Sequence, residues 1–109
     1  MIAADRTFRV DAYVVDVLLR DLVGHDRSAA AFLVFLLLWR HTRGQSAGAR
    51  GPRPQGVRLS HRDIAEETGL SKSAVQQALR VLHRRGLVTS TQRHATDVPE
   101  HKVVRAWAR

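Results

Sequence analysis

The chain has 109 residues, of which 44% are hydrophobic, so it is long enough for one domain with one modest core. Its 18 Lys and Arg residues outnumber 10 Asp and Glu, and the formal net charge of +8 favours a polyanionic partner, nucleic acid or an acidic membrane surface, unless it is only a solvated basic surface. The absence of cysteine excludes disulfides and thiolate metal sites.

Residues 9–24 predict an amphipathic helix with an extended beginning at Phe8–Val10 and a stop at Gly24. Apolar residues recur at steps of three and four, and polar residues fill most of the other face. The apolar stripe consists of Val10, Tyr13, Val14, Val17, Leu18 and Leu22. No signal peptide is expected before it.

Residues 28–43 predict a second helix, capped within Asp26–Ser28 and apolar on every side as far as Trp39. The apolar run 29–39 is shorter than the roughly 20 residues of a membrane span, so we expect a buried helix and no membrane partner. Such a helix needs cover on several sides, from the first helix, the C-terminal half or a second copy. A homodimer that buries part of 29–39 or of the Val10–Leu22 stripe is therefore expected.

Residues 44–56 are rich in Gly, Pro, Ser and Arg and predict a flexible loop. No acid occurs between Asp26 and Asp63. The loop is either a solvated surface segment or an arm that lies along phosphates. The basic residues in this acid-free interval are Arg27, Arg40, Arg43, Arg50, Arg53, Arg58 and Arg62.

A very short strand at Val57–Leu59 leads into the most informative part of the chain. Ser60 and Asp63 have the spacing of a capping box, which predicts a helix at 61–68. Gly69 ends that helix, because glycine takes a positive φ at low cost. Ser71 caps a second helix that reaches Arg84 or Arg85 and stops at Gly86. Its apolar stripe is Ala74, Val75, Ala78, Leu79 and Leu82.

Two β-branched, alternating segments follow, at 87–92 and 101–107, and the polar segment 93–100 between them predicts a hairpin. In the two preceding helices, Ala65 is small where the helices cross, Gly69 suits the turn, and Val75 packs inward. This combination resembles the winged helix-turn-helix superfamily of bacterial DNA-binding proteins. The resemblance implies a mainly α fold with a small β-hairpin and an N-terminal helical extension, as one domain over 1–109 that comprises helices at 9–43, the loop 44–56 and the motif 57–107.

The resemblance also implies a recognition helix in the major groove of double-stranded DNA. The exposed side of the 71–85 helix carries no acid, although an ordinary solvated face is the alternative. Gln and Arg can pair with adenine and guanine, and a helix N-terminus favours phosphate. Asp97 and Glu100 weaken the case for contacts from the hairpin. The expected DNA-binding residues are Ser71, Lys72, Ser73, Gln76, Gln77, Arg80, Arg84, Arg93 and His94, with His83 further along the same face.

The resemblance favours a small transcription regulator in the bacterial cytoplasm or nucleoid. The N-terminal half, through Trp39–Gly44, loosely resembles the DNA-binding module of phage and plasmid replication initiators, so a replication or partition protein is an alternative. A winged helix used for protein contact is another. No enzyme, cofactor or metal is expected, because no catalytic triad, phosphate loop or zinc-ligand spacing occurs among the six His residues. His94 and His101 could approach each other only across the hairpin.

Overall fold

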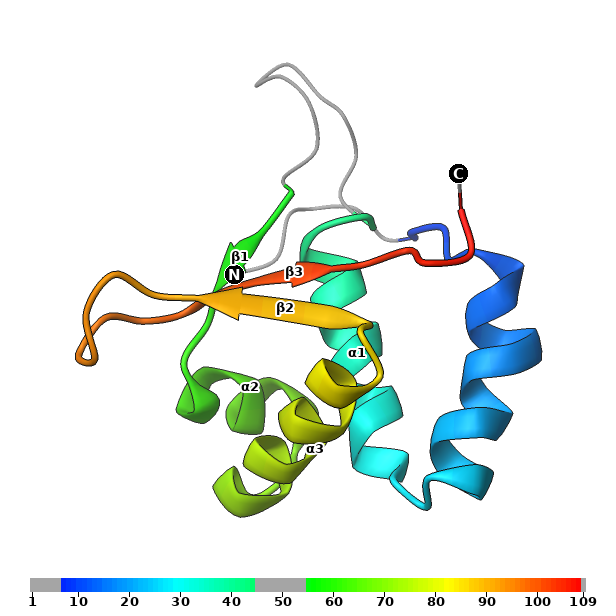
Figure 1. Cartoon of the computed structure of the whole chain (residues 1–109), viewed down its shortest axis with the longest axis horizontal. Coiled ribbons are helices and arrows are strands. Elements are labelled where there is room, and N and C mark those ends of the chain that lie inside the picture. The colour runs from blue at the N-terminus through cyan, green and yellow to red at the C-terminus, as the bar shows by residue number, and fades with distance from the viewer. Residues whose placement is uncertain (1–6, 45–54, 109) are drawn as a thin grey trace.

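The computed structural model describes residues 7–44 and 55–108. They form a mainly helical fold with one small antiparallel sheet (Figure 1), which confirms the predicted fold class. Residues 45–54, most of the predicted loop, lie outside the described residues. In chain order the elements are a helix at 12–25, α1 (Ala29–His41), β1 (Val57–Arg58), α2 (His61–Thr68), α3 (Lys72–Arg84), β2 (Val88–Thr91) and β3 (Glu100–Val103).

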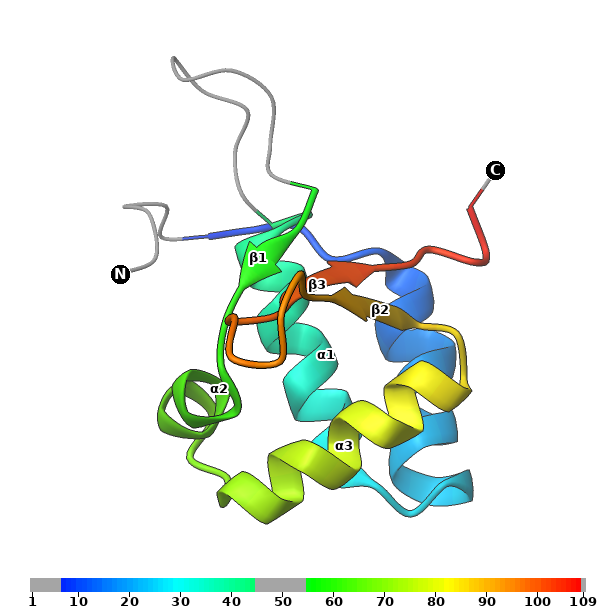
Figure 2. The same cartoon turned by 60° about the vertical axis from the view of Figure 1, so that its left-hand side comes forward.

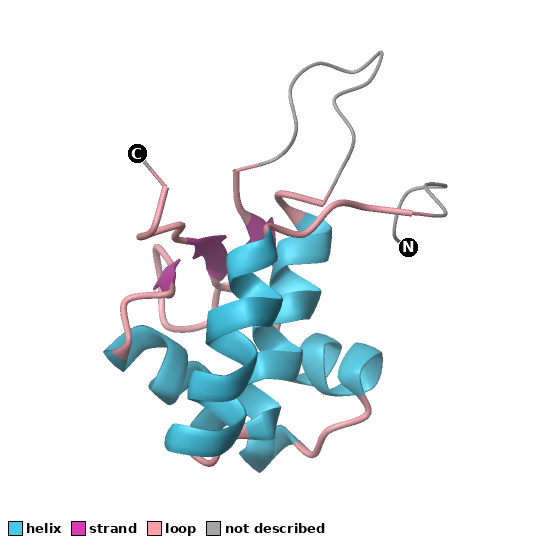
Figure 3. Cartoon of the chain, turned by 90° about the vertical axis from the view of Figure 1, so that its right-hand side faces the viewer, coloured by secondary structure: helices cyan, strands magenta, loops and turns pink. Residues whose placement is uncertain are grey.

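The helix at 12–25, called the N-terminal helix below, packs beside α1 (Figure 3). Its buried side chains, Val14, Leu18 and Leu22, are spaced four residues apart. A helix that combines α and π turns has about four residues per turn, so this spacing keeps the three side chains on one face. The predicted amphipathic helix is confirmed, although it begins at residue 12. Its π-helical stretches are Val14–Leu18 and Asp21–His25.

Helix α1 lies at the centre of the fold, with the N-terminal helix, α2, α3 and β3 packed around it (Figures 1 and 2). Its N-terminus is capped as predicted, because the amide of Ala31 donates to Oγ of Ser28 over 3.1 Å. Among the large apolar side chains of α1, Leu33 is the exposed one, at 43%. The chain thus covers most of this all-apolar helix itself, and a dimer that buries part of 29–39 remains a prediction.

The helix-turn-helix follows the local chemistry of its sequence. The amide of Asp63 donates to Oγ of Ser60 and the amide of Ser60 donates to Asp63, each over 3.0 Å, which completes the capping box. Gly69 and Gly86 have φ of +81° and +69°, the conformation expected at both helix ends. Val75 is fully buried in the core. Both predicted helices are confirmed within one residue.

The sheet has the strand order β1-β3-β2, and both pairings are antiparallel. Strand β3 is central, with Val57 opposite His101 on one side and Val88 opposite Val103 on the other. The hairpin of β2 and β3 with its connecting loop, residues 88–103, is called the wing below. It projects away from the N-terminal helix (Figure 1). The predicted strand at 101–107 is wrong beyond Val103, where the chain leaves the sheet.

The chain leaves the sheet after Val103 because the C-terminal segment contacts the N-terminal segment. The guanidinium of Arg105 donates to Asp11 through Nε at 2.8 Å and lies 2.7 Å from the same oxygen through Nη2. The indole of Trp107 donates to that oxygen over 3.0 Å and stacks on Tyr13, with ring centroids 4.6 Å apart. These side-chain contacts outweigh the alternating pattern that predicted further strand.

Candidate nucleic-acid interface

The exposed side of α3 carries hydroxyl, amide and basic groups. Its apolar stripe is buried against the core, which leaves the other side to solvent. No acidic residue occurs between Ser71 and Arg85. Lys72, Arg80 and Arg84 are exposed and form no ion pair with any residue in the described ranges. The exposed residues on this side are Lys72, Ser73, Gln76, Gln77, Arg80, His83 and Arg84.

The N-terminus of α3 combines a cap with a basic side chain. The amide of Ala74 donates to Oγ of Ser71 over 3.1 Å, and the hydroxyls of Ser71 and Ser73 are 3.2 Å apart. Ser71 therefore has a structural role beside the predicted DNA contact. Lys72 is exposed beside this cap. Free amides and a cation at a helix N-terminus together favour an anion.

A chain of hydrogen bonds joins α3 to the wing and to the segment before α2. Nε2 of His83 is 2.7 Å from Oγ of Ser90, and Oγ of Ser90 is 2.6 Å from Nδ1 of His101. Nε2 of His101, whose side chain is buried, is 3.0 Å from the carbonyl oxygen of Leu59. Both nitrogens of His101 thus make hydrogen bonds inside the protein.

The two histidines joined by these hydrogen bonds, His83 and His101, favour the neutral form. Burial lowers the pKa of His83, and the nearby charge of His61 lowers it further. Burial likewise lowers the pKa of His101, more than the hydrogen bond to the Leu59 carbonyl raises it. A buried histidine could have been anticipated from the sequence, because His101 and Val103 share one face of an alternating strand. Its partners could not, since Ser90 and Leu59 lie far away in sequence.

Arg93 and His94 lie at the tip of the wing and are exposed to solvent. Asp97, which the sequence suggested as a source of repulsion, shapes the turn, because its carboxylate accepts from the amide of His94 over 3.0 Å. The side chain of Gln92 donates to the carbonyl of His94 over 2.8 Å. The carboxylate of Asp97 at the tip therefore has a structural role, as a hydrogen-bond acceptor for the backbone.

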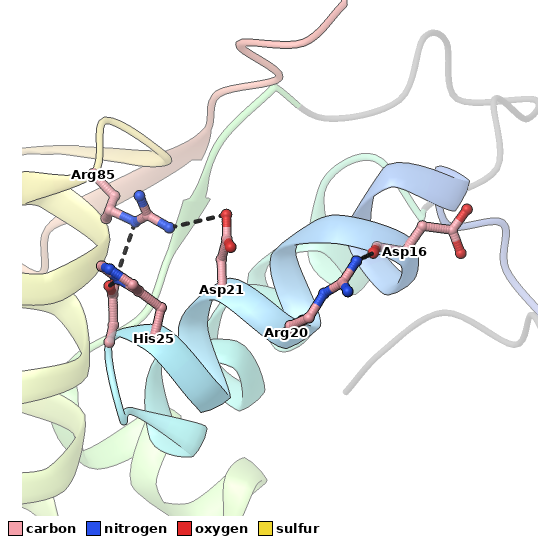
Figure 4. A network of polar contacts seen from close by, with 6 residues as sticks. Asp16, Arg20, Asp21, His25 and Arg85 are labelled. Atoms are coloured by element: carbon pink, nitrogen blue, oxygen red, sulfur yellow. Dashed lines mark hydrogen bonds and ion pairs between the residues drawn. The ribbon is translucent and has the colours of Figure 1, made fainter.

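Arg85, at the end of α3, contacts the protein itself. Its Nε is 3.0 Å from a carboxylate oxygen of Asp26, and its Nη2 is 3.3 Å from Asp21 (Figure 4). A hydrogen bond from His25 and then the charge of Arg85 hold the pKa of Asp26 below its usual value, against the effect of burial. Sequence reasoning missed this link, which fixes the C-terminus of α3 to the N-terminal helix.

The arginine arm expected before the helix-turn-helix is only partly described. Arg50 and Arg53 lie outside the described residues. Arg40 is half-buried in the last turn of α1, with its guanidinium carbon 5.2 Å from the centre of the Phe8 ring. Its stacking shows that it is part of the packed fold rather than of an extended arm.

No helix among the described residues is long and apolar enough to cross a membrane. No group of three or more potential His or carboxylate ligands within 7–44 and 55–108 could hold a metal ion.

Comparison with known proteins agrees with the geometry. Residues 49–97, which contain α2, α3 and most of the wing, match the model described as the MarR family. The matched family consists of winged helix-turn-helix regulators of transcription that bind double-stranded DNA in bacteria. Searches of curated proteins and of solved structures return no significant match. The helix-turn-helix and three-stranded sheet of this chain are therefore a winged helix-turn-helix, similar over residues 49–97 to the MarR family of bacterial transcription regulators.

Proposed function

We propose that this protein is a small transcription regulator that recognises a specific sequence in double-stranded DNA with α3. The observation that carries the proposal is the exposed side of α3, which is amide-rich, basic and free of acids. A surface that binds another protein need be neither basic nor free of acidic residues. The helix is also exposed along its length at the surface of the fold (Figure 2), so a major groove can receive it.

Each predicted contact has a chemical role. Gln76 and Arg80 lie one turn apart near the middle of α3 and can pair with adenine and guanine edges. Gln77 extends that amide surface. The phosphate contacts are assigned to both ends of α3 and to the wing tip, where the groups are hydroxyl or basic. They are Ser71, Lys72, Ser73, Arg84, Arg93 and His94.

The test is the salt dependence of binding to a pool of random-sequence duplexes. If Lys72 neutralises a phosphate, the logarithm of affinity should fall steeply with the logarithm of salt concentration, and Lys72→Ala should reduce that slope by about one. Glu66→Gln is the matched control, since Glu66 is exposed on α2 and pairs only loosely with Arg62, at 4.0 Å. Absence of any salt-dependent binding would reject the DNA proposal and favour a protein partner.

We also propose that two copies assemble through the N-terminal helix. The predicted Val10–Leu22 stripe is largely buried within the chain, but a second line of apolar side chains remains exposed, at 55%, 37% and 40%, respectively, for Val15, Leu19 and Val23. These residues are four apart, and Asp16 and Arg20 flank them. In a two-fold antiparallel helix pair, each Asp16 would face Arg20 of the other copy, so the face is complementary to itself.

We further propose that the N-terminal helices and the helix-turn-helix form one domain. The contacts of Asp11 with Arg105 and of Arg85 with Asp26 support this, because each joins an N-terminal residue to the C-terminal half. A single cooperative unfolding transition is the expected behaviour.

A further inference from the structure

A groove of about 200 Å³ lies between α3 and the wing. Gln76, Arg80 and His83 line it from α3, His61 lines it from α2, and Gln92 lines it from the wing. No carboxylate lies among its lining residues. If α3 lies in one groove of a DNA duplex and the wing lies at the next, a sugar-phosphate strand passes between them, because one backbone separates adjacent DNA grooves. The protein groove between α3 and the wing would then lie where a phosphate of the bound DNA passes.

The hydrogen-bond chain beside this groove fixes the proton positions of the neutral protein. The Leu59 carbonyl can only accept, so Nε2 of His101 must carry its proton. Nδ1 of neutral His101 is then an acceptor, and the hydroxyl of Ser90 donates to it. Oγ of Ser90 is left to accept from Nε2 of His83. His83 therefore keeps Nδ1 as the nitrogen that can take up a proton.

Protonation has opposite effects on the two histidines. A proton on Nδ1 of His83 adds a donor and a positive charge while the bond from Nε2 to Ser90 remains. A proton on Nδ1 of His101 would instead remove the acceptor that Ser90 uses. Of the two histidines, only His83 can gain a positive charge while every hydrogen bond of the series from His83 to Leu59 stays in place.

We propose that this groove receives one backbone phosphate of bound DNA and that His83 takes up a proton as it does so, an inference that rests on the DNA-binding function proposed above. The charged and titratable groups around His83 are all basic: Arg80 on α3, His61 on α2 and His101 on β3. Glu100, the acid of β3, points elsewhere, against Gly56. Without an anion, partial burial and then the nearby charge of His61 lower the pKa of His83 and favour its neutral form.

A phosphate reverses this balance, because an opposite charge nearby favours protonated histidine. The pKa of His83 is lowered in the free protein and rises in the complex, so DNA binding takes up a proton in the interval between the two values. Affinity is lowest above the pKa of the complex and increases as pH falls toward the pKa of the free protein. A rise of about one unit on binding corresponds to a tenfold gain in affinity.

The experiment measures the affinity of the full chain for random-sequence duplexes between about pH 5 and 8 at constant ionic strength. We expect binding to tighten at low pH in the wild type, and His83→Gln to reduce that dependence while the glutamine amide still donates to Ser90. His25→Gln is the control, since the side chain of His25 is 82% exposed at the end of the N-terminal helix and does not line the groove. It should keep the wild-type dependence.

The titration of His83 itself, followed by NMR with and without duplex, gives a second readout. The duplex should raise the pKa of His83, and Nε2 should be the protonated nitrogen of its neutral form. The inference is overturned if the wild type binds with no pH dependence, if His83→Gln leaves the dependence unchanged, or if the duplex does not raise that pKa. Failure to bind at any pH contradicts the proposed function itself, which separates the two results.

Discussion

The guanidinium of Arg85 lies 3.0 Å from the carboxylate of Asp26 and thereby joins the end of α3 to the end of the N-terminal helix (Figure 4). The side chain of Asp26 is only 13% exposed, so this pair is better shielded from water than a typical surface pair. Because Arg84 beside it has no ion pair within the described residues, adjacent arginines have different roles. Arg85 holds α3 in place, whereas Arg84 is exposed and is one of the proposed phosphate contacts.

Arg85→Gln should therefore lower the stability of the fold, whereas its direct effect on DNA affinity should be small. We expect a loss of about 1 kcal/mol, the upper end for a partly exposed ion pair, and a fall in Tm of roughly 4–8 °C for a chain of this size. Arg84→Gln is the matched variant, which should keep Tm and weaken DNA binding. Thermal melts of both proteins give the comparison, and equal Tm values would show that the Arg85 pairs contribute nothing.

Asp11 should make stability depend on pH in the acid range. Burial alone would raise its pKa, but hydrogen bonds from Trp107 and Arg105 outweigh burial and lower it. The resulting stability is present above the ordinary value of about 3.9 and is lost as pH falls through the lowered pKa. Asp11→Asn should cost about 1–2 kcal/mol near pH 7, and the difference from wild type should shrink with acidification.

Denaturant melts at several pH values measure this difference. Glu66→Gln, which removes an exposed carboxylate with only a 4.0 Å ion pair, should leave stability nearly unchanged throughout. A constant difference between Asp11→Asn and wild type down to about pH 2 would contradict the role assigned to the Asp11 carboxylate.

The local features of the fold could be predicted from the sequence, whereas the long-range contacts could not. The Ser60 and Asp63 cap and the turn at Gly69 depend on residues within one helical turn, so their spacing is enough to identify them. The Asp11 and Arg105 pair joins residues at opposite ends of the chain, and no sequence pattern records that proximity. For the same reason the sequence pattern predicts a strand as far as residue 107, although β3 ends at Val103.

The candidate site divides in the same way. The exposed positions of α3 follow from helical periodicity, and Gln76 and Arg80 lie where it predicts. The groove beside them depends on how the wing packs against α3. His61 and Gln92 therefore enter the site only through the tertiary structure.

Gly69 and Gly24 provide a test of the turn. Gly69→Ala should destabilise the protein by about 1–2 kcal/mol, because φ of +81° is strained for any residue with a Cβ. Gly24→Ala, where an added Cβ would meet nothing within 4 Å in a helical position, should be neutral or stabilise by about 1 kcal/mol. Chemical denaturation measures both, and the opposite order would contradict the assigned helix-turn-helix geometry.

The dimer proposal predicts that Leu19→Glu lowers self-association, since it places charge at the centre of the exposed apolar line. Val98→Glu is the matched control, because Val98 is 42% exposed but lies in the wing. Sedimentation equilibrium without DNA should give a dimer for the control and wild type and a weaker dimer or monomer for Leu19→Glu. A monomeric wild type at high concentration would refute the proposed assembly.

The central claim, that α3 reads the sequence of double-stranded DNA, is tested most directly by selection from a random duplex library with wild type and Arg80→Ala in parallel. The wild type should enrich one motif, symmetric if the dimer binds. Arg80→Ala should lose preference at one base pair of that motif, at a cost of about 1–3 kcal/mol for the matched site. Enrichment of no motif, or an identical motif and affinity for the variant, would contradict the assignment of α3 as the reading helix.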